Sequence, residues 1–272
     1  MMGSDAYRSL VRHNPGMCFD HDSRPPIAPI AGGSLDATEL ELEAADGNRF
    51  AAYLARAAEP TGAGIVILPD VRGLHAYYRE LALRFAEHGV DAIAIDYFGR
   101  TAGIGDRGPA FDYQPHVPQT TYDGLSADTM AATAHLRATT SATSVFTIGF
   151  CMGGRLAFLS AGFGLGLSGV IGMYGWPTGA SRNGTPAPAD VAATLEAPVL
   201  AIFGGADEAI GPDVRAAFAA ALEAAGVEHE ITTYEGAPHS FFDRKAEAFA
   251  AQSAAAWGQT LDFIHNRTRG RA

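Results

Sequence analysis

Short apolar runs alternate with longer helical segments along most of the chain. The run Gly64–Leu68 contains no polar position, which is typical of a strand buried on both faces of a parallel sheet. The segment Tyr77–His88 is predicted to be a helix, and Ala92–Ile95 is the next buried strand. Strands that alternate with helices in this way predict an α/β fold, in which helices cover both faces of a mostly parallel sheet.

The same alternation continues towards the C-terminus. Helices are predicted at Thr120–Thr139, Met152–Ala161, Pro212–Ala225 and Lys245–His265, and strands at Ser144–Gly149, Ser168–Met173, Pro198–Phe203 and His229–Tyr234. Earlier in the chain, the strand-like segments Glu39–Ala45 and Arg49–Ala55 flank Asp46-Gly47-Asn48, a typical hairpin turn. We therefore expect about eight strands, with an antiparallel hairpin at the N-terminal edge of the sheet.

No low-complexity linker and no internal repeat divides the chain. We expect an N-terminal extension over residues 1–30 and a single domain over residues 31–272. Two long irregular stretches, 101–119 and 176–197, are rich in glycine and proline. Each follows a predicted strand, where the ligand crevices of such sheets form, so both are candidate pocket walls.

Composition and charge restrict the classes of partner. The chain has 272 residues, of which 47% are hydrophobic and 18% are charged, which suits a large buried core and excludes intrinsic disorder. Its net charge is -11 and no basic run offsets it, so we expect no nucleic-acid or anionic-membrane partner. The uncharged segment Ala157–Trp176 has the length of a membrane span, but its many glycines favour turns and strand ends.

Two cysteines, Cys18 and Cys151, cannot form a disulfide framework or a four-thiolate zinc site. They fit a reducing compartment, and residues 1–29 hold no apolar stretch of signal-peptide length, so a cytoplasmic location is predicted. No histidine spacing resembles a metal site, so we expect no bound metal. The sequence leaves the oligomeric state open.

Cys151 lies in the most informative motif of the chain. Gly149-Phe150-Cys151-Met152-Gly153 follows a predicted strand and begins a helix, as in the G-x-S-x-G nucleophile elbow, with cysteine in place of serine. The sharp turn forces the nucleophile into a strained backbone conformation, and the glycines remove side chains that would collide there. The helix N-terminus favours a thiolate, and the backbone N–H of Met152 is placed as an oxyanion donor.

The alternative is a buried structural cysteine at a tight turn. The order of two further residues favours catalysis: Asp207 follows the strand Pro198–Phe203, and His239 follows the strand His229–Tyr234. In α/β-hydrolases the triad runs nucleophile, acid, base, with each residue at the carboxyl end of its strand. The sequence therefore predicts a Cys151–His239–Asp207 triad.

Four motifs of the chain resemble those of a known family. The motifs that carry the resemblance are Gly149-Phe150-Cys151-Met152-Gly153-Gly154, Gly236-Ala237-Pro238-His239-Ser240-Phe241-Phe242, Leu68-Pro69-Asp70-Val71-Arg72-Gly73 and Asp96-Tyr97-Phe98-Gly99-Arg100. They are similar to those of the dienelactone hydrolase family over about Glu39 to His265. The resemblance implies an α/β-hydrolase fold and hydrolysis of dienelactone to maleylacetate without metal or cofactor.

The resemblance also implies roles for individual residues. Cys151, Asp207 and His239 match the triad, and the backbone N–H of Val71 matches the second oxyanion donor. Asp70 stands where members of the family have a glutamate that holds the cysteine thiol, so thiol activation is its implied role. The alternative for Asp70 is a loop aspartate that caps nearby backbone groups.

The resemblance also concerns two family arginines that bind a substrate carboxylate, and this chain matches them only in part. Arg100 corresponds to one of the two family arginines, but the position of the other is Asp243, and arginine follows as Arg244. Arg72 is an equally plausible carboxylate partner at the pocket mouth, and Arg100 could instead form a surface salt bridge. An acidic residue at 243 would repel an anion, so the sequence predicts a dienelactone-like enol lactone but leaves open whether dienelactone itself is the natural substrate.

Tyr174 and Trp176 leave a predicted strand at its carboxyl end, and they are equally compatible with lining the pocket and with core packing. Together these features predict a hydrolase that cleaves a small-molecule ester or lactone through an S-acyl-cysteine intermediate. The alternatives are a broader carboxylesterase or thioesterase that acts on an unrelated ester, and a non-hydrolytic protein of the same fold that senses thiol chemistry or binds a ligand.

Overall fold

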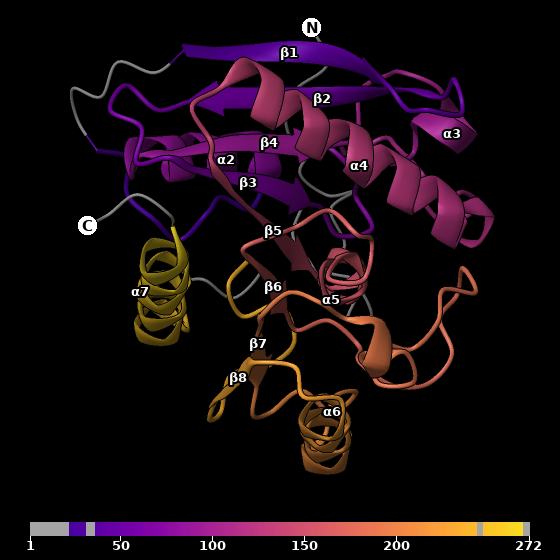
Figure 1. The fold of residues 1–272 in the computed structure, drawn as a ribbon, viewed down its shortest axis with the longest axis vertical. Coiled ribbons are helices and arrows are strands. Elements are labelled where there is room, and N and C mark those ends of the chain that lie inside the picture. The colour runs from indigo at the N-terminus through magenta and orange to yellow at the C-terminus, as the bar shows by residue number, and fades with distance from the viewer. Residues whose placement is uncertain (1–21, 31–35, 244–246, 269–272) are drawn as a thin grey trace, which may run out of the picture.

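Eight strands form one sheet in the order β1-β2-β4-β3-β5-β6-β7-β8 in a computed structural model, which describes residues 22–30, 36–243 and 247–268 (Figure 1). β1 (Asp36–Glu43) pairs antiparallel with β2 (Arg49–Arg56), and β2 pairs antiparallel with β4 (Val90–Ile95). The strands that follow in parallel are β3 (Ala63–Leu68), β5 (Ser144–Phe150), β6 (Gly169–Met173), β7 (Val199–Gly204) and β8 (His229–Tyr234). The predicted α/β architecture is confirmed, including the antiparallel hairpin at the N-terminal edge.

Helices cover both faces of this sheet. The α-helices are α2 (Ala76–Glu87), α3 (Gly99–Ala102), α4 (Tyr122–Thr139), α5 (Met152–Ser160), α6 (Pro212–Ala224) and α7 (Ala250–Arg267), and two 3₁₀ turns lie at Val117–Gln119 and Ala192–Thr194. Figure 1 shows α4, α5 and α6 on one side of the sheet and α2 and α7 on the other. No helix in the described ranges is long and apolar enough to cross a membrane.

The central strands are apolar because both of their faces are covered. Every residue of β3, β4, β5, β6 and β7 is buried, whereas the edge strand β8 is only partly buried. This burial explains why the sequence shows continuous apolar runs for the inner strands. It also fixes the strand register, because a slip by one residue would exchange the two buried faces.

Several predicted boundaries differ from the structure by up to three residues, as for β1, which is predicted at Glu39–Ala45 and spans Asp36–Glu43, and one boundary differs by five. The last helix was expected to begin at Lys245, but α7 begins at Ala250, after a turn over residues 247–249. Phe249 packs against the core at the N-cap of α7, so the chain is anchored by this side chain before the helix starts. Lys245 itself lies outside the described residues, as do residues 31–35, beside the predicted boundary of the N-terminal extension.

Candidate active site

Cys151 occupies the sharp turn between β5 and α5. Its backbone dihedrals are φ 54° and ψ −112°, a conformation that residues other than glycine rarely adopt. The Cys151 N–H donates to the carbonyl oxygen of Met173 at 3.0 Å, and the Arg155 N–H donates to the Cys151 carbonyl at 3.2 Å. Hydrogen bonds to β6 and α5 thus hold the cysteine in a strained conformation, which is typical of a functional position.

The flanking glycines are required by backbone contacts. A Cβ on Gly149 would overlap the carbonyl oxygen of Gly153, and a Cβ on Gly153 would overlap the carbonyl oxygen of Leu68 at the end of β3. Neither obstacle is a movable side chain. The Gly-x-Cys-x-Gly spacing in the sequence therefore reflects the close packing of this turn against the neighbouring strand.

Asp207 and His239 lie in the loops after β7 and β8. The Asp207 Oδ2 is 2.6 Å from the His239 Nδ1, and its Oδ1 accepts a hydrogen bond from the Ala209 N–H at 3.0 Å. β7 and β8 are parallel neighbours, so the loops after them meet at one edge of the sheet. The structure brings together the two residues that the sequence predicted as acid and base, although 32 positions separate them.

The second ring nitrogen of His239 faces a different environment. Its Nε2 is buried and has no hydrogen-bond partner among the described residues. The imidazole packs against the ring of Trp176 at 4.5 Å and against that of Tyr174 at 5.2 Å between centroids. Asp207 therefore orients the ring through Nδ1, whereas Nε2 makes no hydrogen bond to a described residue.

Cys151 lines a cavity of about 400 Å³ at this edge of the sheet. Val71, from the loop after β3, and Met152, the first residue of α5, line the same cavity. β3 and β5 are adjacent parallel strands, with Leu68 opposite Gly149. Because the first N–H groups of a helix have no partner within the helix, the Met152 N–H is free of the α5 ladder.

The two irregular stretches predicted as pocket walls both reach the cavity. Tyr113, Gln114 and Val117 line it from the first, and Trp176 and residues 180–183 and 185 line it from the second. The Arg182 Nη2 donates to the Gln114 Oε1 at 2.8 Å, which links the two stretches. The sequence identified these stretches through their glycine and proline content, but no pattern identified Gln114 or Arg182 individually.

Arg155 lines the cavity but its guanidinium is fully engaged. Nε donates to the Thr185 hydroxyl at 3.2 Å, Nη1 to the carbonyls of Trp176 and Thr178, and Nη2 to those of Gly179 and Thr185. Burial lowers the pKa of Arg155 from its usual value. All five donors hold the loop after β6 in place, so this arginine organises the pocket wall.

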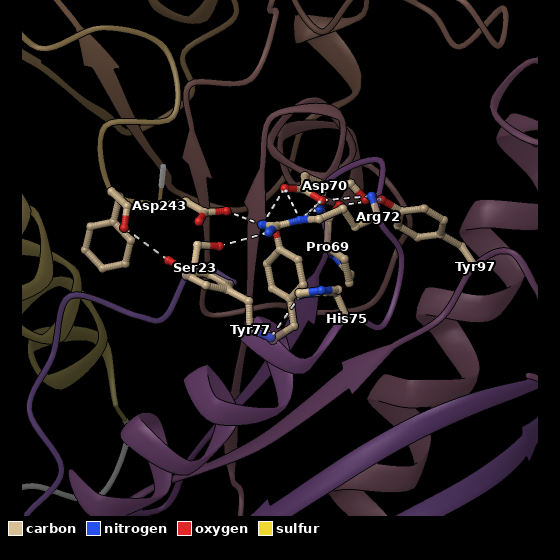
Figure 2. A network of polar contacts seen from close by, with 10 residues as sticks. Ser23, Pro69, Asp70, Arg72, His75, Tyr77, Tyr97 and Asp243 are labelled. Atoms are coloured by element: carbon tan, nitrogen blue, oxygen red, sulfur yellow. Dashed lines mark hydrogen bonds and ion pairs between the residues drawn. The ribbon is translucent and has the colours of Figure 1, made fainter. Parts of the chain in front are cut away.

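Arg72 does not lie at the pocket mouth, where the sequence placed it. It is only 3% exposed, and its guanidinium lies between two carboxylates (Figure 2). Nη2 is 2.9 Å from the Asp70 Oδ2 and also pairs with Asp243, while Nη1 donates to the Ser23 hydroxyl at 3.0 Å. Two carboxylates that are buried without a counter-charge carry a large desolvation penalty. The buried Arg72 guanidinium offsets this penalty, which explains why it lies inside the protein.

Aromatic side chains complete this cluster. The Arg72 guanidinium lies 5.4 Å from the ring centroid of Tyr77 and 5.6 Å from that of Tyr78. The Tyr77 hydroxyl donates to the Phe242 carbonyl at 3.1 Å, and the Tyr78 hydroxyl accepts from the Asp70 N–H at 2.9 Å. Through these bonds α2 supports both the loop after β3 and the loop that contains His239.

Asp70 and Asp243 share the charge of Arg72. Both oxygens of Asp70 accept from the Arg72 Nε at 3.1 Å, and its Oδ1 also accepts the Arg72 backbone N–H at 2.8 Å. This pattern matches the capping alternative for Asp70, and its role towards the thiol stays a prediction. Burial raises the pKa of Asp243 to about 6, although the charge of Arg72 opposes the shift. Burial would lower the pKa of Arg72, but the two carboxylates raise it well above its usual value.

Arg100 is also held away from the cavity. Its Nη1 is 2.5 Å from the Asp46 Oδ2, and its Nη2 is 2.9 Å from the Oδ1 of the buried Asp128. Arg100 is not among the described residues that line the cavity, so its contacts match the salt-bridge alternative. The third candidate, Arg244, lies outside the described residues.

Of the two candidate aromatic residues, Trp176 lines the cavity and Tyr174 does not. Tyr174 is only 1% exposed, has a φ of 40° and packs between Phe150 and His239. The strained backbone at Tyr174 directs the chain from β6 into the pocket loop, so the two residues face different surroundings.

Comparison with known proteins agrees with this geometry. The model of the "Dienelactone hydrolase family" matches residues 50–267. A carboxymethylenebutenolidase of Rhodococcus opacus is 29% identical over 91% of this chain and 96% of its own length. A protein of Methylorubrum extorquens with a provisional carboxymethylenebutenolidase assignment is 30% identical over 88% of this chain and 83% of its own.

Solved structures show the same fold. A crystal structure from Klebsiella pneumoniae, described provisionally as a dienelactone hydrolase, superposes with a TM-score of 0.71 at 29% identity, covering 85% of this chain and 98% of the other. The family match spans the sheet, the cysteine turn and the loops that contain Asp207 and His239. The chain therefore belongs to the dienelactone hydrolase family, a group of α/β-hydrolase-fold enzymes that act on carboxylic esters.

Proposed function

We propose that this protein hydrolyses a small ester or lactone through a Cys151–His239–Asp207 triad. The observation that carries the proposal is the 2.6 Å contact between Asp207 and His239 Nδ1, which leaves a buried Nε2 without a partner among the described residues. This pair follows β7 and β8 at the carboxyl ends of the parallel strands, where the strained Cys151 follows β5. A nucleophile, an oriented base and a cavity are the three parts that acyl transfer needs.

The first half of the reaction forms an acyl-enzyme. The His239 Nε2 takes the thiol proton, and the Cys151 sulfur forms a bond to the carbonyl carbon of the substrate. The carbonyl electron pair moves to oxygen, where the N–H groups of Val71 and Met152 stabilise the negative charge. When the carbonyl re-forms, the C–O bond to the leaving group breaks, and His239 gives its proton to the departing oxygen.

The second half regenerates the enzyme. His239 takes a proton from water, whose oxygen attacks the thioester carbon, and the same N–H groups stabilise the second oxyanion. The C–S bond then breaks, the carboxylic acid leaves, and the proton returns to the Cys151 sulfur. Asp207 stays ionised throughout, because its role is to fix the imidazole tautomer and to stabilise the imidazolium.

A thiolate nucleophile restricts the substrate. Activated esters, enol lactones and thioesters have leaving groups that are expelled readily from the tetrahedral intermediate, whereas an amine competes poorly with loss of the thiolate. The relatives named carboxymethylenebutenolidase are consistent with an enol-lactone substrate. We include a cytoplasmic location and the absence of a nucleic-acid partner in the proposal, on the basis of the cysteine content and the net charge of -11.

The test is hydrolysis of p-nitrophenyl acetate by the wild type and by Cys151→Ala, His239→Ala and Asp207→Asn. We expect Cys151→Ala to be inactive and Asp207→Asn to lose roughly 10³–10⁴-fold in kcat, since asparagine favours the wrong tautomer. Asp213→Asn is the matched control, because Asp213 is exposed at the start of α6.

Mass spectrometry of the acid-quenched wild type should detect an acetyl group on Cys151. If the wild type releases no more product than Cys151→Ala on esters and lactones, the hydrolase proposal is wrong. The thiol-sensor alternative would then remain, although a sensor does not need the Asp207–His239 pair.

A further inference from the structure

We infer that the substrate carries an extended apolar acyl group, which lies along α5 from Cys151 towards Leu159. The inference rests on the proposed hydrolytic function and specifies its substrate class. It follows from the direction, the lining and the size of the cavity that contains Cys151.

The cavity follows one face of α5. Met152, Arg155, Leu156 and Leu159 all line it, and their spacing of three, four and seven positions is that of a single helix face. From Met152 to Leu159 the helix rises by about 10 Å. The cavity therefore extends well beyond the nucleophile, along the helix that the nucleophile precedes.

The inner part of the cavity is apolar. Leu156 and Leu159 line it from α5, Leu125 from the first turn of α4, and Val117 from the 3₁₀ turn before it. All four are at most 4% exposed. The charge of Arg155 is bound by loop oxygens, as described above, and no carboxylate is among the described lining residues. Binding an apolar acyl chain against this surface removes apolar area of both partners from water, which favours binding.

Polar groups gather at the rim, which we define as Gln114 and Arg182. Both residues are exposed, and the hydrogen bond between them joins the two pocket loops. The cavity is thus open to solvent at a polar rim and closed by buried leucines at its inner end. This distribution suits a ligand whose apolar part enters first.

The volume exceeds what a small lactone needs. An apolar cavity of about 150 Å³ is large enough to bind benzene, and a five-membered lactone ring is smaller still than that aromatic guest. The present cavity measures about 400 Å³. More than half of the space would stay unfilled if the ring alone were bound, and unfilled apolar space forgoes contact energy.

The position of His239 indicates that the acyl part of the substrate occupies the cavity. The leaving oxygen receives a proton from His239, so it must lie beside that ring. His239 is not among the described residues that line the cavity, although Trp176 lies between them. The part of the substrate that fills the cavity is therefore the part that stays bonded to Cys151.

The experiment compares p-nitrophenyl acetate, butyrate, hexanoate and octanoate, which share one leaving group. A fully buried methylene group contributes roughly fourfold in binding. We expect kcat/KM to rise at least about tenfold from acetate to hexanoate. As a second arm, phenyl acetate and 4-hexylphenyl acetate, both activated aryl esters, vary only the alcohol, and we expect their kcat/KM values to differ less than about threefold.

Variants of Leu159 connect the preference to the inner end of the cavity. Leu159→Phe should lower the hexanoate-to-acetate ratio of kcat/KM at least about fivefold, because the larger ring fills the space. Leu83→Phe is the matched control: Leu83 is partly buried on α2, away from the cavity, and the ratio should keep its wild-type value. If Leu159→Phe does not fold by circular dichroism, Leu159→Ala enlarges the cavity instead and should raise the octanoate-to-hexanoate ratio of kcat/KM above its wild-type value.

This inference is overturned if the wild-type kcat/KM does not change from acetate to octanoate. The hydrolytic function stays intact in that case, provided that hydrolysis of the acetate ester depends on Cys151. A preference that follows the alcohol and not the acyl chain also overturns it. Loss of Cys151-dependent hydrolysis on every ester overturns the proposed function itself.

Discussion

Arg72 and Asp243 form a buried ion pair although they lie 171 positions apart in the sequence. Arg72 follows Val71, the proposed oxyanion donor, and Asp243 follows the proposed base His239 by four positions. The pair therefore ties the loop after β3 to the loop after β8 (Figure 2). It also explains how an aspartate can occupy position 243, because its charge faces Arg72 and not the cavity.

Removing the cation from this cluster should destabilise the protein strongly. Arg72→Met leaves Asp70 and Asp243 buried without a counter-charge, and we expect the free energy of unfolding to fall by about 3–5 kcal/mol. Asp243→Asn is the control, because it leaves a neutral Arg72–Asp70 pair and should cost much less. Urea unfolding measures both; a loss below about 1 kcal/mol for Arg72→Met would contradict this account.

The raised pKa of Asp243 predicts a dependence of stability on pH. Burial raises this pKa from 3.8 to about 6 in the folded protein, so the folded state binds the proton more tightly than the unfolded state does. The resulting stabilisation is fully present below about pH 4 and is lost as the pH rises through 6.

Asparagine does not titrate, so the comparison with Asp243→Asn isolates this group. The free energy of unfolding of the wild type relative to Asp243→Asn should decrease between pH 4 and pH 7, by an amount on the order of 1–3 kcal/mol. Unfolding in urea at several pH values gives the difference. A difference that stays constant or increases with pH would show that the Asp243 pKa is not raised.

Asp70 can be tested for an effect on the thiol. If Asp70 assists loss of the thiol proton, Asp70→Asn should move the pH profile of Cys151 alkylation by iodoacetamide to higher pH. Asp243→Asn removes a charge from the same cluster and controls for general electrostatic effects. An unchanged profile in Asp70→Asn would restrict Asp70 to holding Arg72 and capping its loop.

The cysteine turn should not tolerate a methyl group. Gly153→Ala places a Cβ against the backbone carbonyl of Leu68, and we expect a loss on the order of 3 kcal/mol or a failure to fold. Gly211→Ala is the control, since a Cβ there meets nothing within 4 Å and its φ is −66°. Thermal unfolding by circular dichroism compares the two, and equal midpoints would contradict the packing argument.

Arg100 should contribute to the stability of the fold and not to binding of a substrate carboxylate. Arg100→Gln leaves the buried Asp128 without its cation, so stability should fall by about 1–3 kcal/mol. The ratio of kcat/KM for dienelactone to that for a neutral lactone of similar size should stay at the wild-type value. A selective loss on dienelactone would restore Arg100 as a carboxylate-binding residue.

Local patterns in the sequence determine the fold and the order of the proposed triad. Continuous apolar runs predict the inner strands because both of their faces are buried, and the glycines around Cys151 predict the turn because backbone atoms pack there. Asp207 and His239 could be selected because each follows a strand, and parallel strands end at a common edge. Each of these signals can be read from the residues that directly precede and follow the position in the sequence.

Only the tertiary structure decided which charges face the cavity. Arg72 and Arg100 looked equally available in the sequence, but each meets carboxylates from distant segments, Asp243 for one and Asp128 for the other. Trp176 lines the cavity and Tyr174 does not, for a reason that depends on how β6 ends. The partner of a long side chain is set by which loops meet in space, and buried charges select these partners through a desolvation cost that no local pattern records.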